Sequence, residues 1–144
     1  MLWTVAHHRW TCEQWSRVLF MDEASFSVTN KDGRFYCYRR QNERYVVGNI
    51  REHMNRGYGC VSIWGAIVHD RKLPLVRIDG RLNAQRYIDN ILTQHVIPYM
   101  RYERANGRVL TLQHDGAPPH TAYTTQEYLE QNNVNVLDWP AISP

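Results

Sequence analysis

The sequence predicts a mixed α/β fold within a single domain. Its 144 residues are an ordinary domain size, large enough to bury a hydrophobic core. Short runs rich in β-branched and aromatic residues fill the first half of the chain, whereas a helical period of apolar residues begins only near residue 83. The resulting order of three strands, a helix, a strand, a helix and a last strand is typical of a mixed sheet flanked by helices.

Strands are expected in the first half because its apolar runs are short and separated by turn residues. One such run lies within 17–26, RVLFMDEASF, and the aromatic or β-branched stretches 33–40 and 44–47 contain two more. The stretch 60–70, CVSIWGAIVHD, is apolar at both alternating positions, which predicts a central strand covered on both faces. After a turn, 73–80 is expected to form its hairpin partner.

From residue 83 onward the apolar positions follow a helical period. Asn83 suits an N-cap, and Pro98 is expected to kink or end the helix that follows. The apolar positions of this helix are Tyr87, Ile88, Ile91, Leu92, Val96 and Tyr99. Residues 109–112 then indicate a short buried strand, followed by a helix at about 121–131 and a strand within 134–139.

Composition excludes several classes of protein. Hydrophobic residues make up 43% and aromatic residues 12%, as in a globular chain. No apolar run approaches the roughly 18 residues that span a bilayer, and no signal peptide is visible, so we expect no membrane partner. The three cysteines, Cys12, Cys37 and Cys60, are far apart and lack zinc-site spacing, which fits a reducing compartment, the nucleus or the cytosol.

The basic residues are mostly arginine. Only Lys31 and Lys72 are lysine, so 15 of the 17 basic residues are arginine, and the net charge is +3. Planar guanidinium groups suit phosphate, although a compositional bias of the genome or a solvated surface explains the same count. The densest basic stretch alternates with tyrosines, which is compatible with a nucleic-acid surface. Its candidate DNA contacts are Arg39, Arg40, Arg44, Arg51 and Arg56.

Two aspartates occupy equivalent places in this predicted order. Asp22 closes the run VLFMD, and Asp115 closes VLTLQHD before a glycine–proline turn. An aspartate at the mouth of a buried strand stays ionised only if a cationic group meets it. If the two strands are neighbours, both carboxylates project from one edge of the sheet and repel unless a divalent cation lies between them.

Oxygen ligands of this kind favour Mg²⁺ or Mn²⁺, and a pair of such ions can support phosphoryl transfer. A simpler interpretation is also open, in which Asp115 caps the turn with its side chain and Asp22 merely ends its strand.

Three segments of the chain resemble the landmark segments of the Tc/mariner superfamily of DDE transposases. These segments are VLFMDEASF, LQHDGAPPHTA and the closing WPAISP. The stretches HRWTCEQWSRVLFMDE and NIREHMNRGYGCVSIWGAI are similar to the approaches to the first acid and to the middle strands of that superfamily. The resemblance covers nearly the whole chain. It implies a ribonuclease-H-like fold, Mg²⁺- or Mn²⁺-dependent cleavage and joining of DNA, and action in the nucleus.

The resemblance also assigns residues. Asp22 matches the first catalytic acid and Asp115 the second, both as metal ligands, while Pro118 and His120 match the turn after the second acid. The third acid of the family is expected beyond Pro144. We therefore expect a helical lead-in at 1–16, a C-terminally truncated catalytic core at 17–144 that lacks the C-terminal catalytic helix, and no activity from this fragment alone.

Three residues near the acids, Glu23, His114 and His120, have other expected roles. Glu23 lies next to Asp22 but points to the opposite face of a strand, so a supporting or surface role is expected. His120 is expected to orient the turn or to touch phosphate, and His114 to end its strand. Trp64 and Trp139 are expected in the core.

Three hypotheses about the function remain open. The first is a transposase catalytic domain that acts on DNA, at transposon ends and target, with a transposase dimer as a further partner and no small-molecule substrate. The second is a non-catalytic remnant that binds DNA or intact transposase subunits. A third is another nuclease with the same fold.

Overall fold

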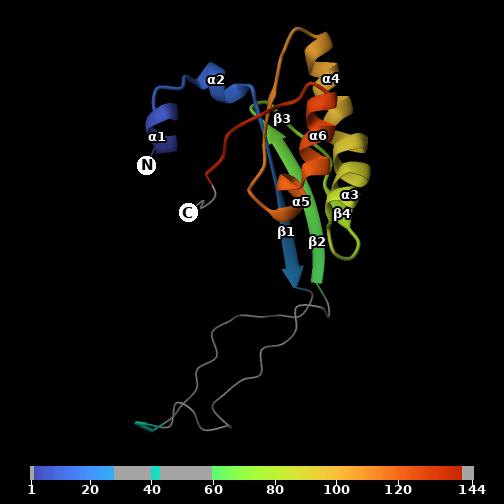
Figure 1. Ribbon diagram of the computed structural model, residues 1–144. Helices are drawn as coiled ribbons and strands as arrows, with labels where there is room; N and C mark the ends of the chain where they lie inside the picture. The colour runs from blue at the N-terminus through green and yellow to red at the C-terminus, as the bar shows by residue number, and fades with distance from the viewer. Residues whose placement is uncertain (1, 28–39, 43–59, 141–144) are drawn as a thin grey trace.

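The computed structural model describes residues 2–27, 40–42 and 60–140 (Figure 1). The strands expected over 33–40 and 44–47 lie outside the described residues except for Arg40. In chain order, the elements are α1 Leu2–His7, α2 Cys12–Ser16, β1 Val18–Ser27, β2 Cys60–Val68, β3 Arg71–Lys72, β4 Val76–Ile78, α3 Ala84–Tyr87, the π-helical segment η2 Ile88–Val96, α4 Ile97–Ala105, β5 Thr111–Gln113, α5 Pro118–Thr121, α6 Tyr123–Gln131 and β6 Asn135–Val136.

The strands form a six-stranded mixed sheet. Its order is β3-β2-β1-β5-β6, and β4 also pairs with β2. β1 and β2 are antiparallel, whereas β1–β5 and β5–β6 are parallel pairs. The expected mixed α/β class is therefore confirmed, and the strands that contain or precede the two aspartates are direct neighbours. The expectation that Asp22 closes its strand is wrong, because β1 continues to Ser27 and Asp22 is paired with Gly65 of β2.

The parallel pair β1–β5 lies at the centre of the core. Leu19 in β1 is paired with Leu112 in β5, and both side chains are fully buried. The Leu112 carbonyl accepts a hydrogen bond from the Leu137 N–H at 2.8 Å, which ties the segment after β6 to the sheet. These contacts hold the second half of the chain against β1.

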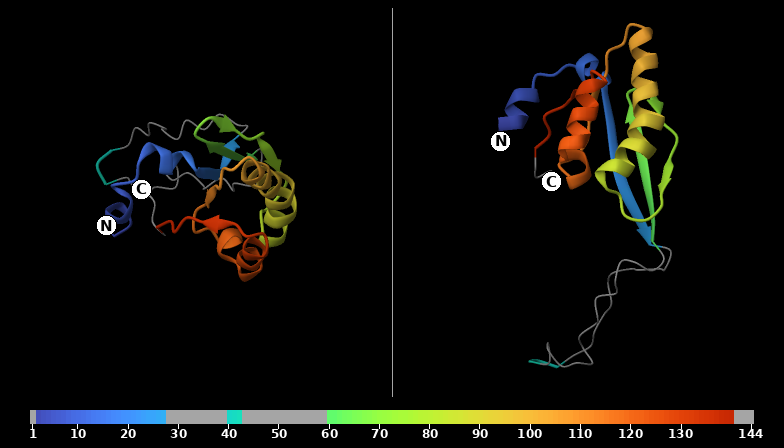
Figure 2. Two further views of the ribbon diagram at one scale, coloured as in Figure 1. Left: turned by 90° about the horizontal axis from the view of Figure 1, so that it is seen from above. Right: turned by 45° about the vertical axis from the view of Figure 1, so that its right-hand side comes forward.

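The helices cover one face of the sheet (Figures 1 and 2). α3, η2 and α4 form one continuous rod along the strands, and α5 and α6 lie beside it. In β2, Trp64, Ala66 and Val68 are buried on this face, whereas Ile67 on the opposite face is 59% exposed. The expectation that β2 is covered on both faces is therefore wrong for the described residues.

The long helix begins as expected but does not end at Pro98. The Asn83 side chain accepts a hydrogen bond from the Arg86 N–H at 2.9 Å and caps α3. In η2 the ladder is wider, so the Ile97 N–H bonds the Leu92 carbonyl five residues back. Pro98 then falls in the first turn of α4, where a missing N–H is tolerated, and the helix continues to Ala105.

An aromatic cluster joins the two N-terminal helices to the end of the chain. Thr11 and Gln14 form a capping box at the start of α2. Trp3 packs edge-on against Trp139 at 4.8 Å between ring centroids, and its indole N–H donates to the Asp138 carbonyl. The half-buried Trp139 is therefore part of this peripheral cluster and not of the main core.

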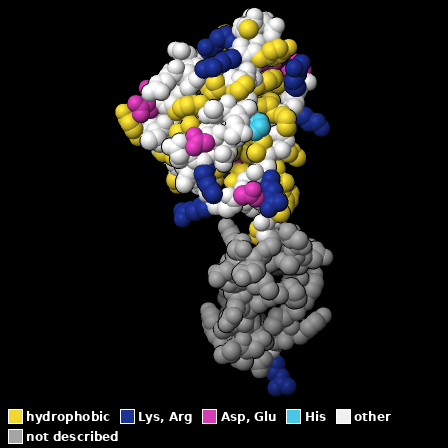
Figure 3. All heavy atoms as spheres, turned by 90° about the vertical axis from the view of Figure 1, so that its right-hand side faces the viewer, with side chains coloured by type: hydrophobic (Ala, Val, Ile, Leu, Met, Phe, Trp, Pro, Cys, Tyr) yellow, Lys and Arg dark blue, Asp and Glu magenta, His cyan; other side chains and the backbone are white. Residues whose placement is uncertain are grey.

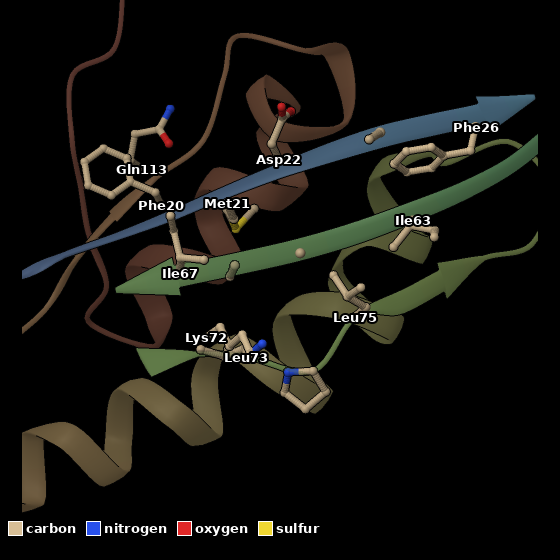
Figure 4. Close-up of a pocket in the computed structure, with 14 residues that line it drawn as sticks. Phe20, Met21, Asp22, Phe26, Ile63, Ile67, Lys72, Leu73, Leu75 and Gln113 are labelled. Atoms are coloured by element: carbon tan, nitrogen blue, oxygen red, sulfur yellow. The ribbon is translucent and has the colours of Figure 1, made fainter. Parts of the chain in front are cut away.

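The uncovered face of the sheet carries a hollow of about 660 Å³ (Figure 4). Its lining is mainly apolar and includes exposed Phe26, Ile67 and Leu75. Asp22 of β1 is the acidic residue of the lining. The first acid is therefore on the sheet face that the helices leave open.

We predict that Leu112→Ala destabilises the fold by about 2–5 kcal/mol, because it leaves a cavity at the centre of the parallel pair. Urea unfolding measures the change. Val109→Ala, three residues earlier and 46% exposed, is the matched control and is expected to change stability by less than about 1 kcal/mol. Equal losses in the two variants would contradict the placement of Leu112.

Candidate active site

The register of the sheet relates the positions of Asp22 and Asp115. Phe20 in β1 is paired with Gln113, the last residue of β5. Asp22 lies two residues after Phe20, within β1, and Asp115 lies two residues after Gln113, beyond the end of β5. Side chains alternate between faces, so Asp22 shares the open face with Phe20. Both aspartates are exposed to solvent. Equivalent positions on neighbouring parallel strands are what a shared site requires.

Asp115 does cap its turn. Its Oδ1 accepts a hydrogen bond from the Ala117 N–H at 3.0 Å, and the same oxygen lies 2.7 Å from His120 Nδ1. Pro118 occupies the first position of the short helix α5, where its missing N–H costs nothing. The Thr125 hydroxyl donates to the Pro119 carbonyl at 2.7 Å and holds this turn against α6.

His120 is the partner of the Asp115 carboxylate. Its side chain is only 2% exposed and lies between two carboxylates. Nδ1 contacts Asp115, and Nε2 faces Glu23 Oε1 at 3.4 Å. The second contact is an ion pair without hydrogen-bond geometry, since neither atom has a hydrogen-bond partner among the described residues. His120 thus bridges the end of β5 and the strand β1.

Burial acts to lower the pKa of His120, but the contacts with the negatively charged Glu23 and Asp115 side chains outweigh it and raise the pKa overall. The pKa of the neighbouring His114 shifts in the opposite direction. Burial, followed by the charge of His120, lowers the pKa of His114 to about 4. The pair therefore consists of a neutral His114 stacked on a more basic His120, with ring centroids 4.9 Å apart.

Tyr87 of α3 completes this buried cluster. Its hydroxyl lies 3.1 Å from His114 Nδ1 and donates to the Met21 sulfur at 3.7 Å. Burial, with the charges of Glu23 and Asp115, raises the pKa of Tyr87 well above its ordinary value. The sequence indicates only that Tyr87 is a core position and that His114 ends a strand. No local pattern could have paired two residues 27 positions apart.

The predicted metal ligands fit a hard cation in chemistry but are only two. Asp22 and Asp115 offer carboxylate oxygens, which Mg²⁺ and Mn²⁺ prefer. Within residues 2–27, 40–42 and 60–140, no group of three or more His, Cys, Asp or Glu side chains is arranged to hold a metal ion. A complete site needs a further ligand from another source.

The predicted DNA contacts lie mostly outside the described residues. Arg40 is described and exposed, whereas Arg39, Arg44, Arg51 and Arg56 are not described. On the part of the molecule coloured in Figure 3, Lys and Arg side chains are scattered over the face shown. No helix among the described residues is long and apolar enough to cross a membrane.

Several known proteins are similar in sequence to this chain. No protein-family model matches the chain. It is 34% identical over 131 residues to the Tc3 transposase of Caenorhabditis elegans, covering 90% of this chain and 38% of the relative. It is 29% identical over 142 residues to the Tc1 transposase of the same organism, and 31% identical over 142 residues to the Tcb2 transposase of Caenorhabditis briggsae, covering 99% of the chain and 51% of each relative.

Solved structures show the same fold. The catalytic domain of the Mos1 mariner transposase superposes with a TM-score of 0.63 at 18% identity, covering 99% of this chain and 58% of that chain. A Mos1 paired-end complex with Mn gives a TM-score of 0.66 at 20% identity over 97% of this chain and 41% of that chain. The fold is therefore the ribonuclease-H-like fold of the Mos1 catalytic domain.

These matches define the class of protein. The chain is homologous to the catalytic domain of Tc1/mariner transposases over most of its length. It spans about half or less of the length of the curated relatives that it matches. The family resemblance of the landmark segments is thereby confirmed.

We predict that His114 makes the stability of the fold depend on pH. Its pKa in the folded state, about 4, is below the value of about 6.5 expected when unfolded. The unfolded chain therefore takes up a proton at a higher pH than the folded chain. The free energy of unfolding keeps its full value above about pH 6.5 and decreases as pH falls toward 4, by at most about 3 kcal/mol.

Urea unfolding of the wild type and His114→Gln at pH 7 and pH 4.5 measures this loss. The variant is expected to lose less stability than the wild type between the two pH values. His69→Gln, at an exposed histidine, is the control and should follow the wild type. An identical pH dependence in wild type and His114→Gln would show that His114 is not held neutral by burial.

Proposed function

We propose that this chain is the catalytic portion of a Tc1/mariner-type DNA transposase, which cleaves DNA at transposon ends and transfers the strand to a target. The observation that carries the proposal is the parallel pairing of β1 with β5, in which Asp22 and Asp115 each follow the Phe20–Gln113 pair by two residues. Homology to the Tc3 and Tc1 transposases supports the same activity.

Each residue of the site has a role in this proposal. Asp22 and Asp115 would hold Mg²⁺ or Mn²⁺, as expected for oxygen donors of this kind. When bound, such ions activate an attacking oxygen and stabilise a leaving one in phosphoryl transfer. Pro118 shapes the turn that follows Asp115, and His120 fixes one oxygen of the Asp115 carboxylate. Mos1 catalytic domain structures with Mg and with Mn support this choice of metal.

DNA is the proposed partner. Mos1 forms a paired-end complex with its left transposon end and a strand transfer complex. By analogy, this chain would contact transposon ends and target DNA, with Arg39, Arg40, Arg44, Arg51 and Arg56 as candidate phosphate contacts. A transposase dimer and a nuclear location belong to the same proposal.

A non-catalytic role is the second candidate. Its support is that the described residues hold no group of three metal-binding side chains, so the two aspartates form an incomplete site by themselves. In that case a polypeptide of these 144 residues would bind DNA or transposase subunits without cutting.

We predict that the chain binds Mn²⁺ through both aspartates. Isothermal titration calorimetry with Mn²⁺ is expected to give one site for the wild type and at least about tenfold weaker binding for Asp22→Asn and for Asp115→Asn, since even supporting residues around a metal contribute about that much. Asp79→Asn, at an aspartate whose side chain is 79% exposed, is the matched control. Binding that survives both substitutions would place the metal elsewhere.

We also predict that a polypeptide of these 144 residues alone neither nicks nor joins DNA in Mg²⁺ or Mn²⁺, because two acids leave the second ion of a two-metal site without an anionic ligand. Incubation with supercoiled plasmid tests this, with Asp115→Ala as the control. Nicking that disappears in Asp115→Ala would show that the two acids suffice and would remove the case for the non-catalytic role.

DNA binding by the same polypeptide is expected to weaken steeply between about 50 and 200 mM salt if arginines contact phosphate. Binding that does not depend on salt would remove the arginine contacts from the proposal.

A further inference from the structure

We propose that Glu23 is a positioning residue for Asp115 and that it acts through His120. This inference deepens the proposed function, because it rests on Asp115 being a metal ligand. Three side chains carry it: Glu23 in β1 and, much later in the chain, Asp115 after β5 and His120 in α5.

The imidazole of His120 connects the two carboxylates through its two opposite nitrogens. Nδ1 lies 2.7 Å from Asp115 Oδ1, and Nε2 lies 3.4 Å from Glu23 Oε1. Both Nε2 and Glu23 Oε1 are buried without a hydrogen-bond partner among the described residues, so each faces only the other. An uncompensated buried carboxylate oxygen is costly, and the pair persists because each atom offsets the burial of the other.

Stacking limits how far the ring can turn. The rings of His114 and His120 are nearly parallel, with an interplanar angle of 11° and centroids 4.9 Å apart. The Tyr87 ring lies 4.5 Å from His120 on the same cluster. Stacking opposes tilting of the imidazole but allows a 180° flip about the Cβ–Cγ bond, which keeps the ring plane. The Glu23 contact at Nε2 favours the orientation in which Nδ1 faces Asp115. The direction of the opposite nitrogen, Nδ1, follows.

The orientation of His120 determines how one oxygen of Asp115, Oδ1, is held. His120 Nδ1 and the Ala117 N–H both contact Oδ1, which fixes the carboxylate. Oδ2 has no protein partner among the described residues and is therefore the oxygen presented to a cation. Because Asp115 is exposed, without this clamp its carboxylate would rotate freely and lose affinity for a metal.

The Glu23 side chain does not act on Asp22 by the same route, because neighbouring residues of a strand point to opposite faces. Glu23 contacts the helix side, whereas Asp22 lines the hollow on the open face. The Glu23 backbone N–H does contact Asp22 Oδ1 at 2.8 Å, but a side-chain substitution leaves that bond in place. A Glu23 variant therefore isolates the path through His120.

The first test needs no metal. NMR of the 144-residue chain would follow the Asp115 carboxyl carbon and the His120 ring nitrogens. Glu23→Ala is expected to shift both sets of resonances, whereas Glu130→Ala, at an exposed glutamate of α6, leaves them unchanged. An Asp115 resonance that does not move in Glu23→Ala would overturn the proposal, whether or not the chain binds a metal.

The second test is a double-mutant cycle with Mn²⁺ as the probe, read by electron paramagnetic resonance. Glu23→Ala is expected to weaken Mn²⁺ binding by about tenfold and Glu130→Ala not at all. In a His120→Asn background, whose amide can still donate to Asp115 but cannot reach Glu23, the Glu23 substitution should have no further effect. An undiminished Glu23 effect in that background would show direct action on the metal and would also overturn the proposal.

The two tests separate this inference from the proposed function. If the wild type binds no Mn²⁺, the metal site fails, while the metal-free resonances still decide whether Glu23 positions Asp115. If Mn²⁺ binding depends on Asp22 and Asp115 but not on Glu23, the metal site holds and the positioning role is wrong.

Discussion

The parallel pairing of β1 with β5 is the constraint on which the site and the second half of the fold depend. Two strands nearly a hundred residues apart meet in register, with Leu19 beside Leu112 in the centre of the core. Asp22 and Asp115 each follow the Phe20–Gln113 pair by two residues, so the pairing brings them to neighbouring strands without any local signal. Apolar burial at Leu19 and Leu112 thus fixes where two exposed, charged side chains are placed.

His120 resolves the electrostatic problem that this arrangement creates. Carboxylates from adjacent strands raise one another's free energy unless a cation lies among them. The imidazole lies between Asp115 and Glu23, and its raised pKa favours the charged form in the metal-free chain. His114, which is neutral, and the Tyr87 hydroxyl belong to the same cluster and add no further charge to it. The same residues therefore stabilise the fold and orient the candidate ligand.

Much of the fold could be predicted from periodicity and turn chemistry. The N-cap at Asn83, the strands before Asp22 and Asp115 and the mixed sheet are local patterns that tertiary packing reinforced. Two local predictions needed correction. Apolar alternation in β2 could not tell that no helix of the described residues covers Ile67, and the helix does not end at Pro98, because Pro98 falls in the first turn of α4.

The site shows the same division. Asp22 and Asp115 could be singled out because each follows a short apolar run, although only Asp115 lies beyond the end of its strand. The contact of His120 with Glu23 spans 97 positions and leaves no periodic signal. The contact of Tyr87 with His114 could not be predicted either. The helical period shows that Tyr87 is buried but not which group its hydroxyl contacts.

The central claim is that Asp22 and Asp115 form the two protein ligands of one cation. The most direct measurement is anomalous diffraction at the manganese edge from crystals of the chain grown with Mn²⁺. We predict a peak bonded to an oxygen of each carboxylate at about 2.1 Å, with Asp115 contributing Oδ2. A peak bonded to neither aspartate, or to only one of them, would contradict the account.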